Sequence, residues 1–224
     1  MAGTTYLGGG GSADDEAQLW HAMLSRNRKV LYWPFAIPPE GRTAAADWFA
    51  TSLDHLGVIA DIETWADLDG RSPEDPLPAD LLFVGGGNTF TLLDHVRRAG
   101  YLGTVRAFVA AGGDYYGGSA GAILACESIA LAAELDSNDV GLVDLQGLGL
   151  VSGFAVFPHY TPDRAPVLRA WIAQHHTTVV GIPERSGLVV DDGLARVEGT
   201  VAAWEITAAR AVARPPGYHW RPGA

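Results

Sequence analysis

The amino-acid sequence predicts an α/β fold of three layers, with helices on both faces of a doubly wound, mostly parallel sheet. Short apolar runs alternate with amphipathic segments through the first half of the chain, which is typical of βαβ units. Glycine-rich turns follow several of these runs. Because parallel strands deliver the loops after their carboxyl ends to one edge of the sheet, we expect the functional residues at that edge.

The N-terminal elements begin with a short strand at Tyr6-Leu7 and the run Gly8 to Gly11. Ser12 is expected to cap a helix whose first turn holds Asp14, Asp15 and Glu16, since acidic side chains suit the positive end of a helix dipole. The pattern then predicts strands at 29–33, 58–62 and 80–84, helices at 43–56, 90–96 and 105–110, and a short strand up to Tyr116 that leads into a helix from Ala122. From about residue 150 the pattern turns strand-rich, with runs at 154–157, 179–182 and 188–190.

The whole chain, residues 1–224, is expected to form one domain. No long Ser/Gly-rich or charge-rich linker and no internal repeat divides the sequence, and a hydrophobic content of 48% is ample for a packed core. Residues 214–224 read as an irregular tail.

The formal net charge of −11 argues against a general nucleic-acid or anionic-membrane binder, because both partners reward clustered Lys and Arg. A single cysteine, Cys126, excludes an internal disulfide framework and suits a reducing cytoplasm. The first residues show neither the basic nor the apolar region of a signal peptide, and the apolar runs are shorter than the ~20 residues that span a bilayer. We therefore expect a cytoplasmic protein, of an oligomeric state that the sequence leaves open.

The most informative motif is Gly117-Gly118-Ser119-Ala120-Gly121, between an apolar run and a helix-forming one. A G-x-S-x-G motif at a strand-to-helix junction is typical of a nucleophile elbow, in which small residues permit a tight turn that presents the serine. The alternative is a glycine-rich turn that merely contains a serine. The order of strand, turn and helix favours the elbow.

A serine hydroxyl needs a base, and the sequence holds seven histidines. His21, His55 and His95 fall within expected helices, His175 and His176 at a helix end, and His219 in the tail. His159 follows an apolar strand directly after Pro158, which suits a side chain held in place, and it is the leading general base.

The acid that would orient this histidine is not chosen by spacing. The carboxylates between the elbow and His159 are Glu127, Glu134, Asp136, Asp139 and Asp144. For the oxyanion, we expect the amide of Ala120, with a second donor from Gly85-Gly86-Gly87. That loop could instead cradle a phosphate, but it matches neither the dinucleotide-binding nor the P-loop pattern. No metal-ligand spacing is present, so no metal or other cofactor is expected.

Five segments together resemble the peptidase E family of serine peptidases, which includes aspartyl dipeptidases: 84–90, the elbow at 117–122, 138–140, 158–159 and 181–184. The resemblance implies a fold like the class I glutamine amidotransferases, which is flavodoxin-like. It implies Ser119 as nucleophile, His159 as base, and the amides of Gly87 and Ala120 as oxyanion donors. The family's Asn-Asp motif falls on Asn138-Asp139, which implies Asp139 as the acid, with Glu134 second because it lies nearer the dipeptidase spacing. Arg164 and Asn88 are implied as substrate-binding residues, with Arg169 as the alternative to Arg164.

The function expected from these observations is a serine dipeptidase that acts on short peptides through an acyl-enzyme, with a preference for an N-terminal aspartate bound by Arg164. Two alternatives remain. The chain could be a non-hydrolytic, amidotransferase-like binding or sensor protein, or an esterase or amidase that uses the same machinery.

Overall fold

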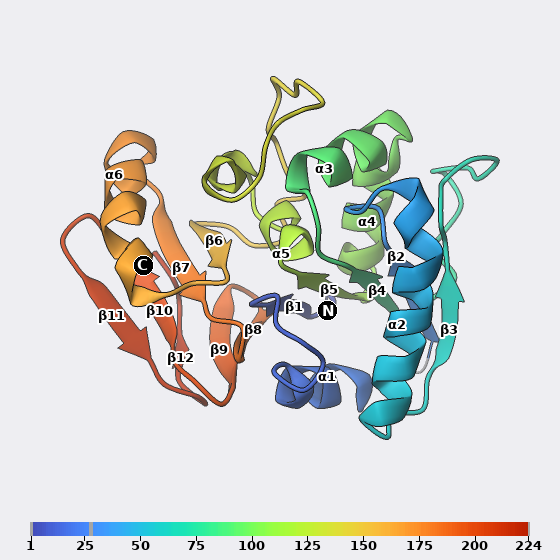
Figure 1. Ribbon diagram of the computed structural model, residues 1–224, viewed down its shortest axis with the longest axis horizontal. Coiled ribbons are helices and arrows are strands. Elements are labelled where there is room, and N and C mark those ends of the chain that lie inside the picture. Colours follow the sequence, from blue (N-terminus) through green and yellow to red (C-terminus); the bar gives the residue numbers. More distant parts are fainter. Residues whose placement is uncertain (1, 27–28, 224) are drawn as a thin grey trace.

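The computed structural model describes residues 2–26 and 29–223. Within these residues, eight strands form a central sheet in the order β12-β9-β8-β1-β5-β4-β2-β3 (Figure 1). The bounds are β1 (Thr5–Gly8), β2 (Lys29–Trp33), β3 (Asp61–Thr64), β4 (Leu81–Val84), β5 (Asp114–Gly118), β8 (Ser186–Asp191), β9 (Leu194–Gly199) and β12 (His219–Trp220). The five strands from β1 to β3 in this order pair in parallel, and β8, β9 and β12 add antiparallel pairs. The expected α/β fold class is confirmed.

Helices cover both faces of the sheet (Figure 1). One face carries α1 (Ala17–Leu24) and α2 (Arg42–His55), and the other carries α3 (Thr89–Arg98), α4 (Tyr101–Ala110) and α5 (Ala120–Leu124). Successive strand residues point to opposite faces, so Tyr115 packs into the core beneath α3 to α5 and Tyr116 into the core beneath α1 and α2. Both side chains are buried.

The strand-rich C-terminal part forms a second, four-stranded sheet in the order β11-β10-β7-β6. It comprises β6 (Phe154–Pro158), β7 (Thr178–Ile182), β10 (Ala203–Ile206) and β11 (Ala211–Arg214), and α6 (Ala165–His175) packs on it. β6 and β7 pair in parallel, with Pro158 opposite Ile182. The loops that follow these two strands therefore lie next to each other.

Two boundaries differ from the sequence expectation. The strand expected at 58–62 is β3 at Asp61–Thr64, because β3 takes its register from β2, with Lys29 opposite Asp61. Ser12 accepts a hydrogen bond from the Asp15 amide at 3.2 Å, but it caps a turn, and the helix begins only at Ala17.

The tail expected to be irregular contains a strand. His219–Trp220 forms β12, which pairs with β9, and the Trp220 side chain is 8% exposed. Its indole Nε1 donates to Glu205 of β10 at 3.2 Å. Burial of one large aromatic side chain anchors a segment whose Pro and Gly content predicts no regular structure.

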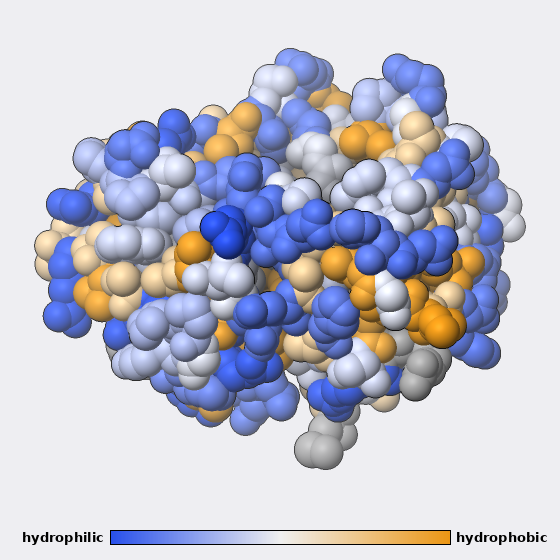
Figure 2. Space-filling view, turned by 60° about the horizontal axis from the view of Figure 1, so that its bottom comes forward, coloured by the Kyte–Doolittle hydropathy of each residue, from blue (hydrophilic) through white to orange (hydrophobic). Residues whose placement is uncertain are grey.

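The surface in Figure 2 is predominantly hydrophilic, with hydrophobic residues gathered toward the side on which α2 and β3 lie. None of the helices in the described part of the chain is long and apolar enough to cross a membrane.

Candidate active site

Ser119 lies at a sharp turn between β5 and α5, at the carboxyl edge of the parallel strands. Its backbone angles are φ 49° and ψ −107°, a conformation that non-glycine residues rarely adopt. The glycines on either side permit the turn: a Cβ on Gly117 would lie 2.3 Å from the Gly121 carbonyl carbon, and one on Gly121 would lie 2.5 Å from the Val84 carbonyl oxygen. The structure thus has the strand–turn–helix context that the motif requires.

His159 follows β6, and its Nε2 lies 2.9 Å from Ser119 Oγ. Its backbone is in the left-handed region at φ 51°, and its amide donates to the Gly9 carbonyl at 2.8 Å. The loop after β1 therefore holds the histidine backbone against the nucleophile. The side chains of Ser119 and His159 therefore lie within hydrogen-bond distance of each other.

The carboxylate at the other side of the imidazole belongs to Glu184. Its Oε1 lies 3.1 Å from His159 Nδ1. Glu184 comes two residues after β7, and the parallel pairing of β6 with β7 brings it beside His159. Ser119, His159 and Glu184 thus form one hydrogen-bonded chain.

The expected acids have other partners in the structure. Glu134, at the end of the 3-10 helix Ala130–Glu134, contacts Arg164, and the Asp139 carboxylate accepts from Ser137 Oγ at 2.7 Å. Asp136, also among the earlier candidates, accepts from the Thr89 amide and hydroxyl at 2.8 and 2.6 Å. The sequence held a signal for Glu184, which lies two residues after an expected strand and ends one of the five resembling segments. Glu184 lies outside the segment between the elbow and His159, which holds the carboxylates considered from spacing.

The glycine run after β1 is packed against the catalytic loops. A Cβ on Gly9 would lie 2.0 Å from the Pro183 carbonyl oxygen, and one on Gly10 would lie 2.4 Å from the His159 ring and 2.9 Å from Ser119 Cβ. Gly10 also has φ 89°. The run therefore lets the backbone approach His159 and the Glu184 loop closely.

A buried carboxyl group, that of Glu16, holds this glycine run by hydrogen bonds. It accepts from the amides of Gly10 at 2.7 Å and Gly11 at 3.3 Å, from the Trp20 indole at 3.2 Å, and from the Tyr116 hydroxyl. Burial raises the pKa of Glu16 to about 7, although its hydrogen-bond donors act in the opposite direction. The sequence suggested only a helix-dipole role for this residue, because nothing in the local pattern reveals the long-range contact with Tyr116.

The glycine loop after β4 lies beside Ser119. The amides of Gly85 and Asn88 donate to the carbonyls of Trp33 at 3.1 Å and Ala36 at 2.7 Å, which fixes the loop on both sides of Gly86 and Gly87. A Cβ on Gly86 would lie 3.2 Å from Ser119 Cβ. Ala120 is the first residue of α5, so its amide has no acceptor within its own helix.

The two residues expected to bind substrate have protein partners. The Asn88 side chain caps α3 by accepting from the Thr91 amide at 2.9 Å, and it donates to the Ser137 carbonyl at 2.9 Å. Arg164 Nη2 donates to the Glu134 carbonyl at 3.2 Å and lies 3.9 Å from the Glu134 carboxylate. The structure thus brings Arg164 to Glu134 and uses Asn88 to join two loops.

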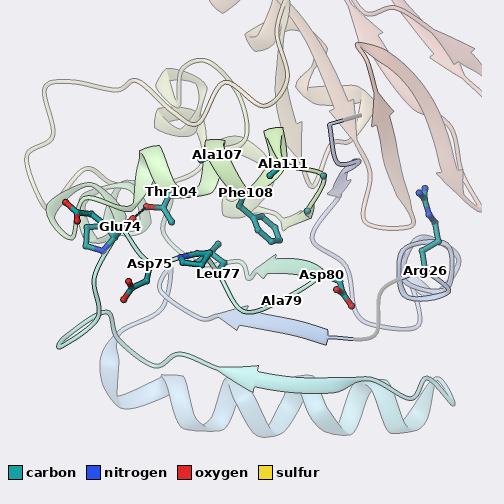
Figure 3. A pocket seen from close by; sticks show the side chains of 14 residues that line it. Arg26, Glu74, Asp75, Leu77, Ala79, Asp80, Thr104, Ala107, Phe108 and Ala111 are labelled. Carbon is teal, nitrogen blue, oxygen red and sulfur yellow. Dashed lines mark hydrogen bonds between the residues drawn. The ribbon is translucent and has the colours of Figure 1, made fainter.

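Two cavities differ in their relation to Ser119. One, of about 700 Å³, is bordered by Asp80 and Gly113, just before β4 and β5, and Phe108 projects into it (Figure 3). It therefore lies at the amino edge of the sheet, opposite the elbow. The other, of about 410 Å³, is lined by Ser119 itself. Ligands of open α/β sheets bind at the carboxyl edge, so the second cavity belongs to the site.

Among the described residues, no three His, Cys, Asp or Glu side chains are grouped so as to hold a metal ion. The polar side chains at the elbow are the hydroxyl of Ser119, the imidazole of His159 and the carboxylate of Glu184. A half-buried serine at an elbow, hydrogen-bonded to a histidine that contacts a carboxylate, is the arrangement of a serine hydrolase.

Comparison with known proteins agrees with this class. The model of peptidase family S51 matches residues 6–197. Peptidase E of Salmonella typhi and that of Salmonella typhimurium strain LT2 are each 31% identical over 229 aligned residues, covering 92% of this chain and 94% of each relative. The chain belongs to peptidase family S51 and is a serine-type peptidase.

Two solved structures share the fold. A protein from Listeria monocytogenes EGD-e, assigned to peptidase E, superposes with a TM-score of 0.71 at 24% identity, over 89% of this chain and 99% of its own. A peptidase from an acI-B1 actinobacterium superposes with a TM-score of 0.67 at 18% identity, over 99% of this chain and 97% of its own.

Proposed function

We propose that this chain hydrolyses the peptide bond of dipeptides and other short peptides, with Ser119 as nucleophile, His159 as general base and Glu184 as the orienting acid. The observation that carries the proposal is the continuous chain of contacts, 2.9 Å from Ser119 Oγ to His159 Nε2 and 3.1 Å from His159 Nδ1 to Glu184 Oε1. Each distance is within hydrogen-bond reach for proton transfer or ring orientation.

In the first half-reaction, Ser119 Oγ attacks the carbonyl carbon of the scissile bond while His159 Nε2 takes the hydroxyl proton. The amide of Ala120, the residue after Ser119, and that of Gly87, the residue after Gly86 beside Ser119, stabilise the tetrahedral oxyanion. Collapse breaks the C–N bond, and His159 gives its proton to the leaving amine. Glu184 holds the Nδ1–H tautomer and stabilises the imidazolium that forms.

In the second half-reaction, His159 takes a proton from water as the water oxygen attacks the acyl ester of Ser119. The C–O bond to Ser119 then breaks, the carboxylic acid leaves, and His159 returns the proton to Ser119 Oγ. The proton transfers in both half-reactions use the side chain of His159. The single buried cysteine suits a reducing compartment, and we place the reaction in the cytoplasm.

The complete contact chain favours hydrolysis over a binding or sensor role, since such a role needs no activated hydroxyl. An esterase or amidase activity uses the same steps, and the family membership favours the peptide bond.

Specificity for an N-terminal aspartate, which the resemblance implies, would require a cation available to that side chain. Arg164 is engaged by the carbonyl and carboxylate of Glu134 and lies over the Phe157 ring. A guanidinium that is already paired with a carboxylate gains less from a second one. We therefore propose that Arg164 supports the Glu134 segment and does not make the enzyme specific for aspartate.

Hydrolysis of a dipeptide panel by the wild type and by Ser119→Ala tests this function. The expected result is turnover that falls by about a thousandfold or more in Ser119→Ala, since loss of the nucleophile removes the covalent route. Thr91→Ala, outside the contact chain, serves as a control for general damage to the fold. Wild-type turnover that Ser119→Ala retains would contradict the proposal.

A further inference from the structure

The cavity of about 410 Å³ beside Ser119 is enclosed mainly by aromatic side chains. It extends from Ser119 along the glycines of the elbow and of the β4 loop toward α2. Its large side chains are Trp20, Tyr32, Trp48, Phe83 and Tyr116. Its volume lies within the range of roughly 300–1,000 Å³ that is common for small-molecule pockets.

These aromatic rings form a preformed wall. Phe83 and Tyr116 stack with their centroids 4.0 Å apart, and Trp20 meets Phe83 edge to face at 5.2 Å. All three are buried, whereas Trp48, which meets Trp20 at 6.0 Å, is 47% exposed. The wall is therefore fixed by the core, and Trp48 forms its rim at the surface of α2.

The lining carries no formal charge. Among the described residues that line it there is no Lys, Arg or His, and its ionisable groups are two tyrosines. Burial raises the pKa of Tyr32 to about 12 and that of Tyr116 well above its ordinary value, so both hydroxyls are neutral at neutral pH. An acidic side chain placed here would lose hydration without meeting a cation.

A carboxyl group behind the wall has the wrong sign for an acidic ligand. The carboxyl of Glu16 accepts hydrogen bonds from Trp20 and Tyr116, which both line the cavity. In its ionised form it repels a second carboxylate. Charge and desolvation therefore both select against aspartate and glutamate.

We propose that this cavity is the specificity pocket of the site, and that it takes an aromatic or large aliphatic side chain of the peptide residue next to the scissile bond. The inference rests on the proposed peptidase function and names its substrate class. An aromatic side chain that enters the cavity gains apolar burial and edge-to-face contacts with the wall.

The test separates binding from turnover. Isothermal titration calorimetry with the Ser119→Ala variant measures dissociation constants for Phe-Ala, Ala-Phe, Ala-Ala, Asp-Ala and Ala-Asp, so the result does not depend on hydrolysis. We expect one of the two Phe peptides to bind about tenfold or more tightly than Ala-Ala and than its Asp counterpart. Which Phe peptide binds shows whether the pocket serves the acyl or the leaving residue.

Two variants in the Ser119→Ala background locate the effect in the cavity. Trp48→Ala should reduce the ratio of the dissociation constants of the Ala and Phe peptides by about tenfold, because the variant lacks the rim of the cavity. Ala45→Arg places a cation in the lining and should shift the preference toward the Asp peptide, whereas Ala50→Arg, on the exposed side of the same helix, should not. Circular dichroism checks that each variant is folded.

The inference is overturned if no peptide binds, if the Asp peptides bind as tightly as the Phe peptides, or if Trp48→Ala leaves the preference unchanged. Turnover by the wild type tests the proposed function separately. If the protein binds Phe peptides and cleaves none, the specificity pocket is supported and the proposed peptidase activity is contradicted.

Discussion

Glu16 is a carboxyl group with four hydrogen-bond donors in the core, one loop away from the nucleophile. Its pKa rises from 4.5 to about 7 because burial disfavours the charged form. A group whose pKa is raised on folding stabilises the protein fully below its unfolded pKa, and that contribution is lost as the pH rises through the folded pKa. The window is therefore about pH 4.5 to 7.

Glu16→Gln tests this assignment. We expect the wild type to lose stability relative to the variant between pH 5 and pH 8, by an amount on the order of 3 kcal/mol for a shift of this size. Urea unfolding of both proteins at both pH values measures this loss. The difference between the two proteins cancels the contributions of the histidines and other carboxylates that titrate in the same range. Parallel pH profiles for the two proteins would contradict the raised pKa.

The element that sets the site geometry is the glycine run between β1 and α1. The run packs against the His159 ring. Two of its amides donate hydrogen bonds to Glu16, and the carbonyl of Gly9 accepts one from the His159 amide. Its function is mechanical, because it lets one backbone segment approach the histidine, the elbow and the Glu184 loop together.

Gly10→Ala should displace His159 from Ser119. A Cβ there meets the imidazole at 2.4 Å, and the φ of 89° disfavours any L side chain. We expect kcat/KM to fall about a hundredfold or more, as small misplacements of catalytic groups do. Gly57→Ala is the matched control: it also has a positive φ, 66°, but a Cβ there meets nothing within 4 Å. Equal losses of activity in the two variants would contradict a specific role for Gly10.

Among the helices, strands and turns, the sequence predicts those that have a local pattern of their own. The elbow, His159 and most of the N-terminal strands and helices follow from turn chemistry and apolar periodicity. Glu184 and Glu16 could not be assigned in the same way. Their positions depend on β6 pairing with β7 and on α1 packing against Tyr116, which are contacts between segments far apart in the chain.

In the whole molecule, the two sheets meet through the C-terminal segment. β12 pairs with β9 of the large sheet, and the Trp220 indole donates to Glu205 on β10 of the small one. Arg214 also pairs with Glu205. This arrangement could not be predicted from a local pattern, because a two-residue strand among prolines and glycines has no periodicity.

Trp220→Ala should therefore destabilise the fold. Truncation of a buried tryptophan costs about 3–5 kcal/mol, and the Glu205 carboxylate would lose one donor. Thermal unfolding of this variant should show a clear fall in Tm, whereas Tyr218→Ala, at a 41% exposed neighbour, should show a small one. Similar Tm values for Trp220→Ala and the wild type would contradict an anchoring role.

The central claim is that Glu184, and neither Asp139 nor Glu134, completes the catalytic chain with His159 and Ser119. The most direct measurement is kcat/KM, on the best-cleaved dipeptide, of Glu184→Gln, Asp139→Asn and Glu134→Gln. We predict a fall on the order of 10³–10⁴ for Glu184→Gln, as expected when the partner of the imidazole can no longer hold its tautomer, and changes of less than about tenfold for the other two. A Glu184→Gln enzyme that keeps its activity while Asp139→Asn or Glu134→Gln loses it would contradict the account.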